Sequence, residues 1–76
     1  MNLYPDVWAQ LTRAEQKTLE PLQAAAALAA TDGRATMLAD QIDHELGPKA
    51  VLAGARQIVL TELKSIAWWL RNCAAR

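Results

Sequence analysis

The sequence contains no phenylalanine, one cysteine, one histidine, three glycines and three prolines among 76 residues. Because Cys73 has no second cysteine to pair with, the sequence excludes an internal disulfide. A structural zinc site needs about four cysteine or histidine ligands, and only Cys73 and His44 are present. A domain of this length buries only about 60% of the surface of its unfolded chain. With both kinds of cross-link excluded, we expect oligomerisation to support the fold.

The sequence also lacks an excess of charge, because eight basic and eight acidic residues give a net charge of zero. This balance argues against a dedicated binder of nucleic acid or acidic membranes. The distribution is uneven, since residues 1–46 carry seven acids and three bases, whereas residues 47–76 carry one acid and five bases. These halves, with charges of −4 and +4, favour packing against each other, within one chain or between two copies.

Neither an export signal nor a membrane span is evident. The N-terminal residues MNLYPDVW have no basic segment followed by an apolar one. No window approaches the roughly 18 uncharged apolar residues that a transmembrane helix needs. Together with the free thiol, these observations predict a cytoplasmic protein.

Signals for β-strands are scarce as well. No segment alternates apolar and polar residues, and the one Asp-Gly dipeptide, at 32–33, lies between helical patterns. Sixteen alanines, with leucine, glutamate, glutamine, lysine and arginine, make strong helix formers dominant. The sequence therefore predicts a single all-α domain over residues 1–76.

Within this domain, we expect a lead-in segment over residues 1–11 and a first helical arm over residues 12–46. The stretch from Thr12 to Glu15 fits a capping box that begins the arm. The arm should kink or break near Pro21, because an internal proline removes a helical hydrogen bond, and again at residues 31–33. Between these points, the small side chains of LQAAAALAA would let another helix approach closely.

Gly47-Pro48 is the strongest helix-ending signal, since glycine suits the position after a helix and proline the first position of the next. A long C-terminal helix is predicted over residues 48–74, about 40 Å in length. Folding back at Gly47-Pro48 gives an antiparallel helical hairpin of two or three helices, and two copies give a dimeric four-helix bundle. In the alternative, the last helix breaks near Gly54 and a compact monomer forms a three-helix bundle.

One stripe of apolar residues recurs every three or four positions along this last helix, as at contacts between packed helices. We predict that the stripe is the seam of the oligomer, formed by Leu52, Ala55, Val59, Leu63, Ile66 and Leu70. Cys73 continues the stripe, which is typical of a small core residue rather than a nucleophile.

Two adjacent tryptophans near the end of the chain must point about 100° apart on a helix. Trp69 extends the apolar face, whereas Trp68 falls in a polar sector. Because aromatic and arginine side chains are favoured at binding hot spots, we predict a partner surface made of Trp68, Lys64, Arg71 and Arg56. In the alternative, Trp68 closes the end of the bundle against Tyr4 or Trp8.

Basic side chains form a second stripe at spacings of 7, 8 and 7, namely Lys49, Arg56, Lys64 and Arg71. Flanking charges in helical bundles select the orientation of the partner, and the acids of the first half are natural mates for this stripe. Two alternatives to protein binding remain: the stripe would suit a DNA-binding regulator, and Trp68 with Trp69 would suit a peripheral membrane protein.

Signs of catalysis or metal binding are weak. Asp40 and His44 share one helix face, as metal ligands often do, but the chain offers no second histidine. No nucleophile has a base beside it, and no glycine-rich phosphate loop is present. We therefore expect no enzyme, metal or cofactor, and predict a small self-associating interaction or regulatory accessory protein. The alanine-rich composition and small size suggest a bacterial, plasmid or phage source.

Overall fold

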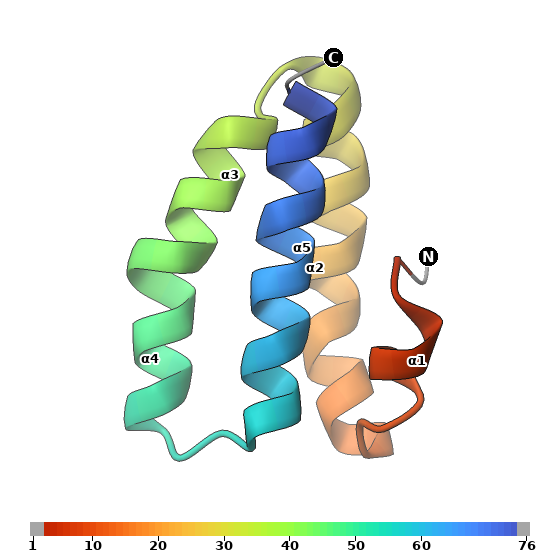
Figure 1. Ribbon diagram of the computed structural model, residues 1–76, viewed down its shortest axis with the longest axis vertical. Coiled ribbons are helices and arrows are strands. Elements are labelled where there is room, and N and C mark those ends of the chain that lie inside the picture. Colours follow the sequence, from red (N-terminus) through yellow and green to blue (C-terminus); the bar gives the residue numbers. More distant parts are fainter. Residues whose placement is uncertain (1–2, 75–76) are drawn as a thin grey trace.

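The computed structural model describes residues 3–74, which are helical over most of their length (Figure 1). The elements are α1 (Pro5–Trp8), α2 (Arg13–Asp32), α3 (Ala35–Gln41), the π-helical segment η1 (Ile42–Leu46), α4 (Gly47–Leu52) and α5 (Gln57–Ala74). Because α3, η1 and α4 follow one another without interruption, we call them together the α3–α4 arm. The all-α prediction is confirmed for the described residues, none of which forms a strand.

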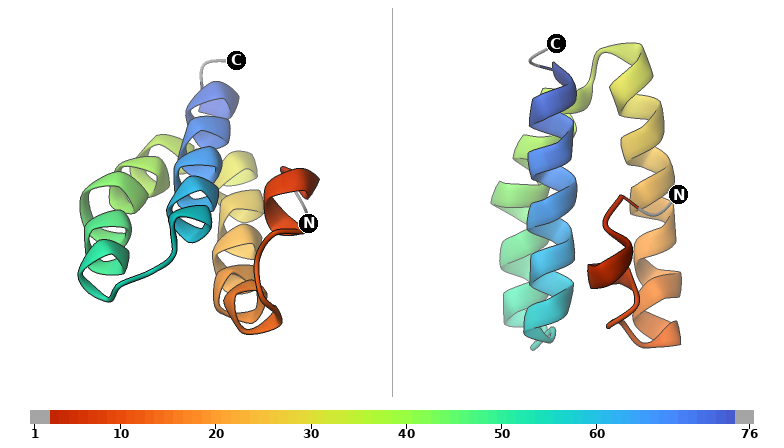
Figure 2. Two further views of the ribbon diagram at one scale, coloured as in Figure 1. Left: turned by 60° about the horizontal axis from the view of Figure 1, so that its bottom comes forward. Right: turned by 45° about the vertical axis from the view of Figure 1, so that its right-hand side comes forward.

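The molecule consists of three long segments side by side, namely α2, the α3–α4 arm and α5 (Figure 1). The short helix α1 lies against the lower half of α2 and α5, on the side away from the arm (Figure 2). It belongs to the predicted lead-in segment, whose first two residues lie outside the described part of the chain.

α2 begins at the predicted capping box. The Glu15 backbone N–H donates to the Thr12 hydroxyl at 3.2 Å, and the Thr12 N–H donates to the Glu15 carboxylate at 2.8 Å. A kink or a break was expected near Pro21, and the helix does not break there, since α2 continues to Asp32. Pro21 is exposed, so water can reach the carbonyl that lacks its helical partner. The predicted break at residues 31–33 is confirmed, since Gly33 ends α2 with φ of 83°.

Removing the cap of α2 should have a measurable effect on stability. We expect Thr12→Ala to lower the free energy of unfolding by about 1 kcal/mol, because one N–H of the first turn loses its acceptor. Urea denaturation followed by circular dichroism measures this change. The control is Thr36→Ala, which removes an exposed hydroxyl inside α3 and should cause no loss. An equal loss in both variants would contradict a specific role for the cap.

Gly47-Pro48 does not end a helix, contrary to the sequence prediction. The π-helical turn η1 lets the arm continue through the proline, with the Gly47 N–H donating to the carbonyl of Ile42 five residues earlier. The missing Cβ of Gly47 relieves the side-chain part of the clash that a residue before proline normally meets in helical backbone. A Cβ there would also lie 3.2 Å from the Ile42 carbonyl oxygen. Glycine at this position therefore keeps the arm helical.

The predicted continuous helix over residues 48–74 is wrong. Residues 53–56 interrupt it, with Gly54 at φ of 76° and the Ala55 N–H donating to the Ala50 carbonyl at 2.9 Å. The chain reverses here, so that α5 runs back between the arm and α2 (Figure 1). The break near Gly54 agrees with the alternative of three packed helical segments in one chain.

The core lies where the three segments meet. Ala26 of α2 and Ala39 of α3 are fully buried, and their small side chains allow close approach to α5. α5 contributes the largest share of the core through Leu63, Ile66, Ala67 and Leu70. The acidic and basic halves do meet in ion pairs: Arg56, just before α5, pairs with Glu15 of α2, and Arg71 of α5 pairs with Asp40 and Asp43 of the arm.

Candidate interaction surface

An apolar groove runs along α2 beside the α3–α4 arm, and Val59 and Leu63 of α5 line the part of it farther from Gly33. Three hollows of about 170, 450 and 300 Å³ follow one another from the Gly33 turn to the open end. Ala25 lines the first two hollows, and Leu19 and Val59 line the second and third. The three hollows therefore form one groove that follows α2 from Ala29 to Ala14, a length of roughly 22 Å.

The groove exists because small side chains line its opposite walls. α3 packs on α2, whereas α4 packs on α5 and leaves space beside α2. Ala25 on one wall and Ala50 on the other are too small to fill that space, and Leu22, Leu46 and Val59 form its apolar lining. A groove of this length and character is typical of sites that receive a helix.

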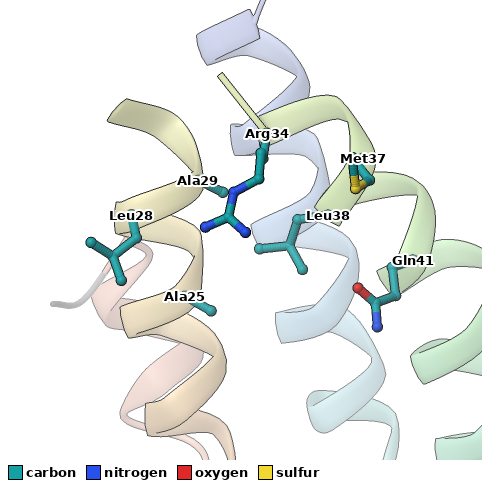
Figure 3. A pocket seen from close by; sticks show the side chains of 7 residues that line it. All are labelled: Ala25, Leu28, Ala29, Arg34, Met37, Leu38 and Gln41. Atoms are coloured by element: carbon teal, nitrogen blue, oxygen red, sulfur yellow. The ribbon is translucent and has the colours of Figure 1, made fainter. Parts of the chain in front are cut away.

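The end of the groove next to the Gly33 turn carries two exposed apolar side chains. Leu28 of α2 is 63% exposed and Met37 of α3 is 68% exposed. Figure 3 shows the Arg34 side chain between them, extended over this end of the groove. The Arg34 guanidinium donates to Asp32 at 2.7 and 3.0 Å, which raises the pKa of Arg34 and lowers the pKa of Asp32. This end therefore combines a neutral ion pair with protruding apolar groups.

The residues of the predicted oligomer seam are divided among three places. Leu63, Ile66 and Leu70 are buried in the core of the single chain. Ala55, Val59 and Leu63 line the groove. Leu52 is 88% exposed at the end of α4, because the turn at residues 53–56 removes it from the helical phase of α5.

The predicted partner surface is also divided. Trp68 is 61% exposed on the side of α5 that faces away from the core, so it does not close the core against Tyr4 or Trp8. Lys64 lies one turn earlier and lines a separate hollow of about 210 Å³ between α5 and the arm. Arg56 and Arg71 lie near opposite ends of α5, and both are held in ion pairs.

These ion pairs neutralise most of the basic stripe. The Arg56 guanidinium donates to both Glu15 oxygens, at 2.6 and 2.9 Å, and lowers the pKa of Glu15 to about 2. At the other end of α5, hydrogen bonds to Asp40 and Asp43 raise the pKa of Arg71. Lys49 pairs with Glu45 at 3.3 Å. Within residues 3–74, Lys64 alone of the four basic residues is outside an ion pair, which weakens the argument for a DNA-binding stripe.

A buried polar pair joins α2 to α5. Gln23 is 2% exposed, and its side-chain N–H donates to the Oε1 of Glu62 at 3.2 Å. Glu62 is fully buried, and its Oε2 has no hydrogen-bond partner within the described residues. Burial raises the pKa of this carboxyl. Sequence reasoning missed this pair, although Glu62 shares the side of α5 that carries Ile58 and Trp69, which was a usable signal.

The groove itself was only partly indicated by the sequence. The alanine-rich run after Pro21 was recognised as a place where another helix can approach, and Ala25 and Ala29 of that run do line the groove. Leu28 and Met37 were missed as exposed residues. Met37 lies outside the stripe of Ala35, Leu38 and Ile42, and this position off the buried face was the available signal.

Within residues 3–74, no three histidine, cysteine, aspartate or glutamate side chains are placed to hold a metal ion. None of the helices in this range is long and apolar enough to cross a membrane. Comparison of the chain with protein families, curated proteins and solved structures found no match.

Proposed function

We propose that the protein is a self-associating interaction module in which the groove and the adjacent face of α2 receive α2 of a second copy. The observation that carries this proposal is an exposed, largely apolar face of α2 along the edge of the groove. Its members Pro21, Ala24, Ala25 and Leu28 are all exposed in the single chain. Uncovered apolar surface beside a long groove is typical of protein interfaces.

The small side chains at the middle of this face favour an antiparallel crossing of two copies of α2. A two-fold axis between Ala24 and Ala25 places Ala24 of one copy opposite Ala25 of the other, so that the two helices can approach closely. In the same register, Leu28 lies opposite Pro21 of the second copy, beside the largest hollow of the groove. The protruding leucine of each copy therefore enters the open space of the other, as symmetric dimers require.

Charge supports the same register. Lys17 is exposed near the start of α2, and no ion pair of the described chain includes it. The two-fold axis places Lys17 opposite Asp32 at the end of α2 in the second copy. The carbonyl groups of a helix C-terminus carry partial negative charge, which a lysine stabilises. An antiparallel pair of α2 helices thus brings Lys17 to the partial negative charge at the C-terminus of the second α2, where Arg34 already pairs with the Asp32 carboxylate.

A disulfide cross-link tests the proposal directly. With Cys73 replaced by serine, Ala24→Cys should give a covalent dimer on mild oxidation, because cysteines beside the axis meet the short Cα separation that a disulfide needs. Asn72→Cys, exposed on the outward side of α5, is the matched control and should remain monomeric on a denaturing gel. Equal cross-linking of both variants, or none of Ala24→Cys, would overturn the proposed interface.

The mass in solution gives an independent measurement. We expect light scattering on a size-exclusion column to show a dimer for the unmodified chain and a monomer for Leu28→Glu, because the new carboxylate would be buried in the interface. Trp68→Ala, which changes an exposed apolar residue on the opposite side of α5, should leave the dimer intact. This measurement includes a protein concentration of about 100 μM, roughly 100 times a micromolar dissociation constant. A monomeric unmodified chain at that concentration would contradict self-association.

This dimer leaves the outward side of α5 uncovered. Trp68 and Lys64 lie on that side and stay available for the further protein partner that the sequence suggested. The predicted role as an interaction or accessory protein is therefore kept as a proposal, with the groove for self-association and Trp68 for the second contact.

A further inference from the structure

The short helix α1 covers one side of α5 through few attachments. Leu3 and Trp8 pack against the core, and the Gln16 side chain donates to the Trp8 carbonyl at 3.0 Å. Arg56 holds the end of this segment by donating to the Gln10 carbonyl at 3.2 Å. Leu11, which follows this segment, is itself buried in the core. The part of the chain before Leu11 is held by two apolar side chains and two hydrogen bonds, so it can detach without unfolding the three long segments.

The helix α5 on which α1 packs carries the fully buried Glu62. Gln23 of α2 donates to its carboxyl, and Tyr4, at the start of α1, is half-buried. Burial raises the pKa of Tyr4, and the negative charges of Glu62 and Cys73 raise it further. None of the ion pairs in the described chain includes Glu62, so its charge has no direct compensation there.

Among the other charged groups near the cover, Asp6 of α1 is exposed to solvent and outside the ion pairs of the described chain. Glu15 and Arg56 pair with each other at the base of α1. The α3–α4 arm lies on the other side of α5, where Asp43 pairs with Arg71. Ionisation of Glu62 therefore places one uncompensated negative charge between α1, α2 and α5.

Closing α1 over Glu62 favours the neutral carboxyl, because burial without a partner for Oε2 penalises the charged form. Opening α1 lets water reach the carboxyl and stabilises its charge. We propose that α1 is a flap whose closing is coupled to protonation of Glu62, so that the flap closes over the neutral acid and opens when the acid ionises. Opening would expose the apolar surface that Trp8 and Leu3 cover. This opening does not depend on the proposed dimer.

Amide hydrogen exchange measured by NMR tests this coupling. The reporters are the Ala9 and Leu11 amides, which donate to carbonyls of Pro5 and Trp8 at 2.9 and 3.1 Å. After correction for intrinsic exchange, their protection should fall as the pH rises from about 4.5, the ordinary pKa of the acid, to its raised value in the closed state. Each unit of that difference corresponds to roughly a tenfold change in the open population.

Glu62→Gln is expected to remove this pH dependence, because the amide side chain does not ionise. Glu20→Gln, which changes an exposed acid on α2, is the control and should keep the dependence of the unmodified chain. The Leu70 amide in the core of α5 serves as the reference for global unfolding. Loss of protection with pH that is the same in Glu62→Gln and in the unmodified chain would overturn the proposal.

The reciprocal experiment does not depend on the folding of Glu62→Gln. Trp8→Ala should loosen the flap, and the Glu62 pKa, followed by the carboxyl carbon in NMR, should move down toward about 4.5. The control Gln10→Ala, on an exposed side chain of the same segment, should leave that pKa unchanged. An unchanged Glu62 pKa in Trp8→Ala would show that α1 does not govern the acid, and would also overturn the proposal.

Discussion

Ile66→Ala is expected to lower the free energy of unfolding by about 2 to 5 kcal/mol, whereas Leu52→Ala should change it by less than about 0.5 kcal/mol. Both residues belong to the stripe that the sequence assigned to an oligomer seam. Ile66 of α5 is fully buried, so its truncation to alanine leaves a cavity in the core. Leu52 is 88% exposed at the end of α4, so truncation removes little contact.

Urea denaturation at several protein concentrations measures both effects. Leu70→Ala is the matched control for Ile66, because it is also fully buried on α5 and should lose a comparable amount. A loss for Ile66→Ala that depended on protein concentration would place this residue between copies instead of inside one chain. Equal losses for Ile66 and Leu52 would contradict the break between α4 and α5.

This contrast shows which part of the stripe the sequence could predict. The spacing of Leu63, Ile66 and Leu70 identified the buried face of α5 because apolar periodicity reports burial directly. It could not tell whether the face packs inside one chain or against another, since both contacts exclude water in the same way. The spacing therefore identified buried positions of α5, while the oligomer seam itself stays a prediction, separate from the α2 interface proposed above.

The helix boundaries were harder to predict because local signals compete with packing. Gly47-Pro48 is a typical helix end, yet the π-turn and the missing Cβ of Gly47 keep the arm helical. Gly54 between two alanines gives a weaker local signal, yet its left-handed backbone is where the chain reverses. In both places the outcome depends on how the arm packs against α5, which local propensity does not contain.

The candidate sites follow from these boundaries and were accordingly missed in part. The acidic and basic halves predicted attraction between them, but not that Glu15 would meet Arg56, since this pairing needs the turn at residues 53–56. The groove depends on the same turn, because it places the α4 end of the arm beside α5 and away from α2. A continuous last helix would have left no such groove to predict.

Removing one member of the buried polar pair should be far more harmful than removing both. We expect Gln23→Met to lower the free energy of unfolding by about 1 to 3 kcal/mol at pH 7, because Glu62 then loses the N–H that reaches Oε1. The double variant Gln23→Met with Glu62→Met should recover most or all of this loss, since no buried polar atom remains without a partner. A double variant that lost the sum of the two single losses would contradict a hydrogen-bond origin and indicate poor packing instead.

The effect of pH identifies the charge of Glu62 as part of this loss. Its pKa is raised in the folded chain above the ordinary 4.5, so its contribution to stability is fully present below that value and is lost as the pH rises through the folded pKa. Glu15 acts in the opposite direction, since its pKa of about 2 gives stability above pH 4.5 that is lost as the pH falls toward 2. Urea denaturation at pH 5 and pH 8 should therefore show a decline in stability for the unmodified chain that the double variant lacks. A decline of equal size in both would assign the pH dependence to other groups and would mean that Glu62 ionises in the folded chain as it does in the unfolded chain.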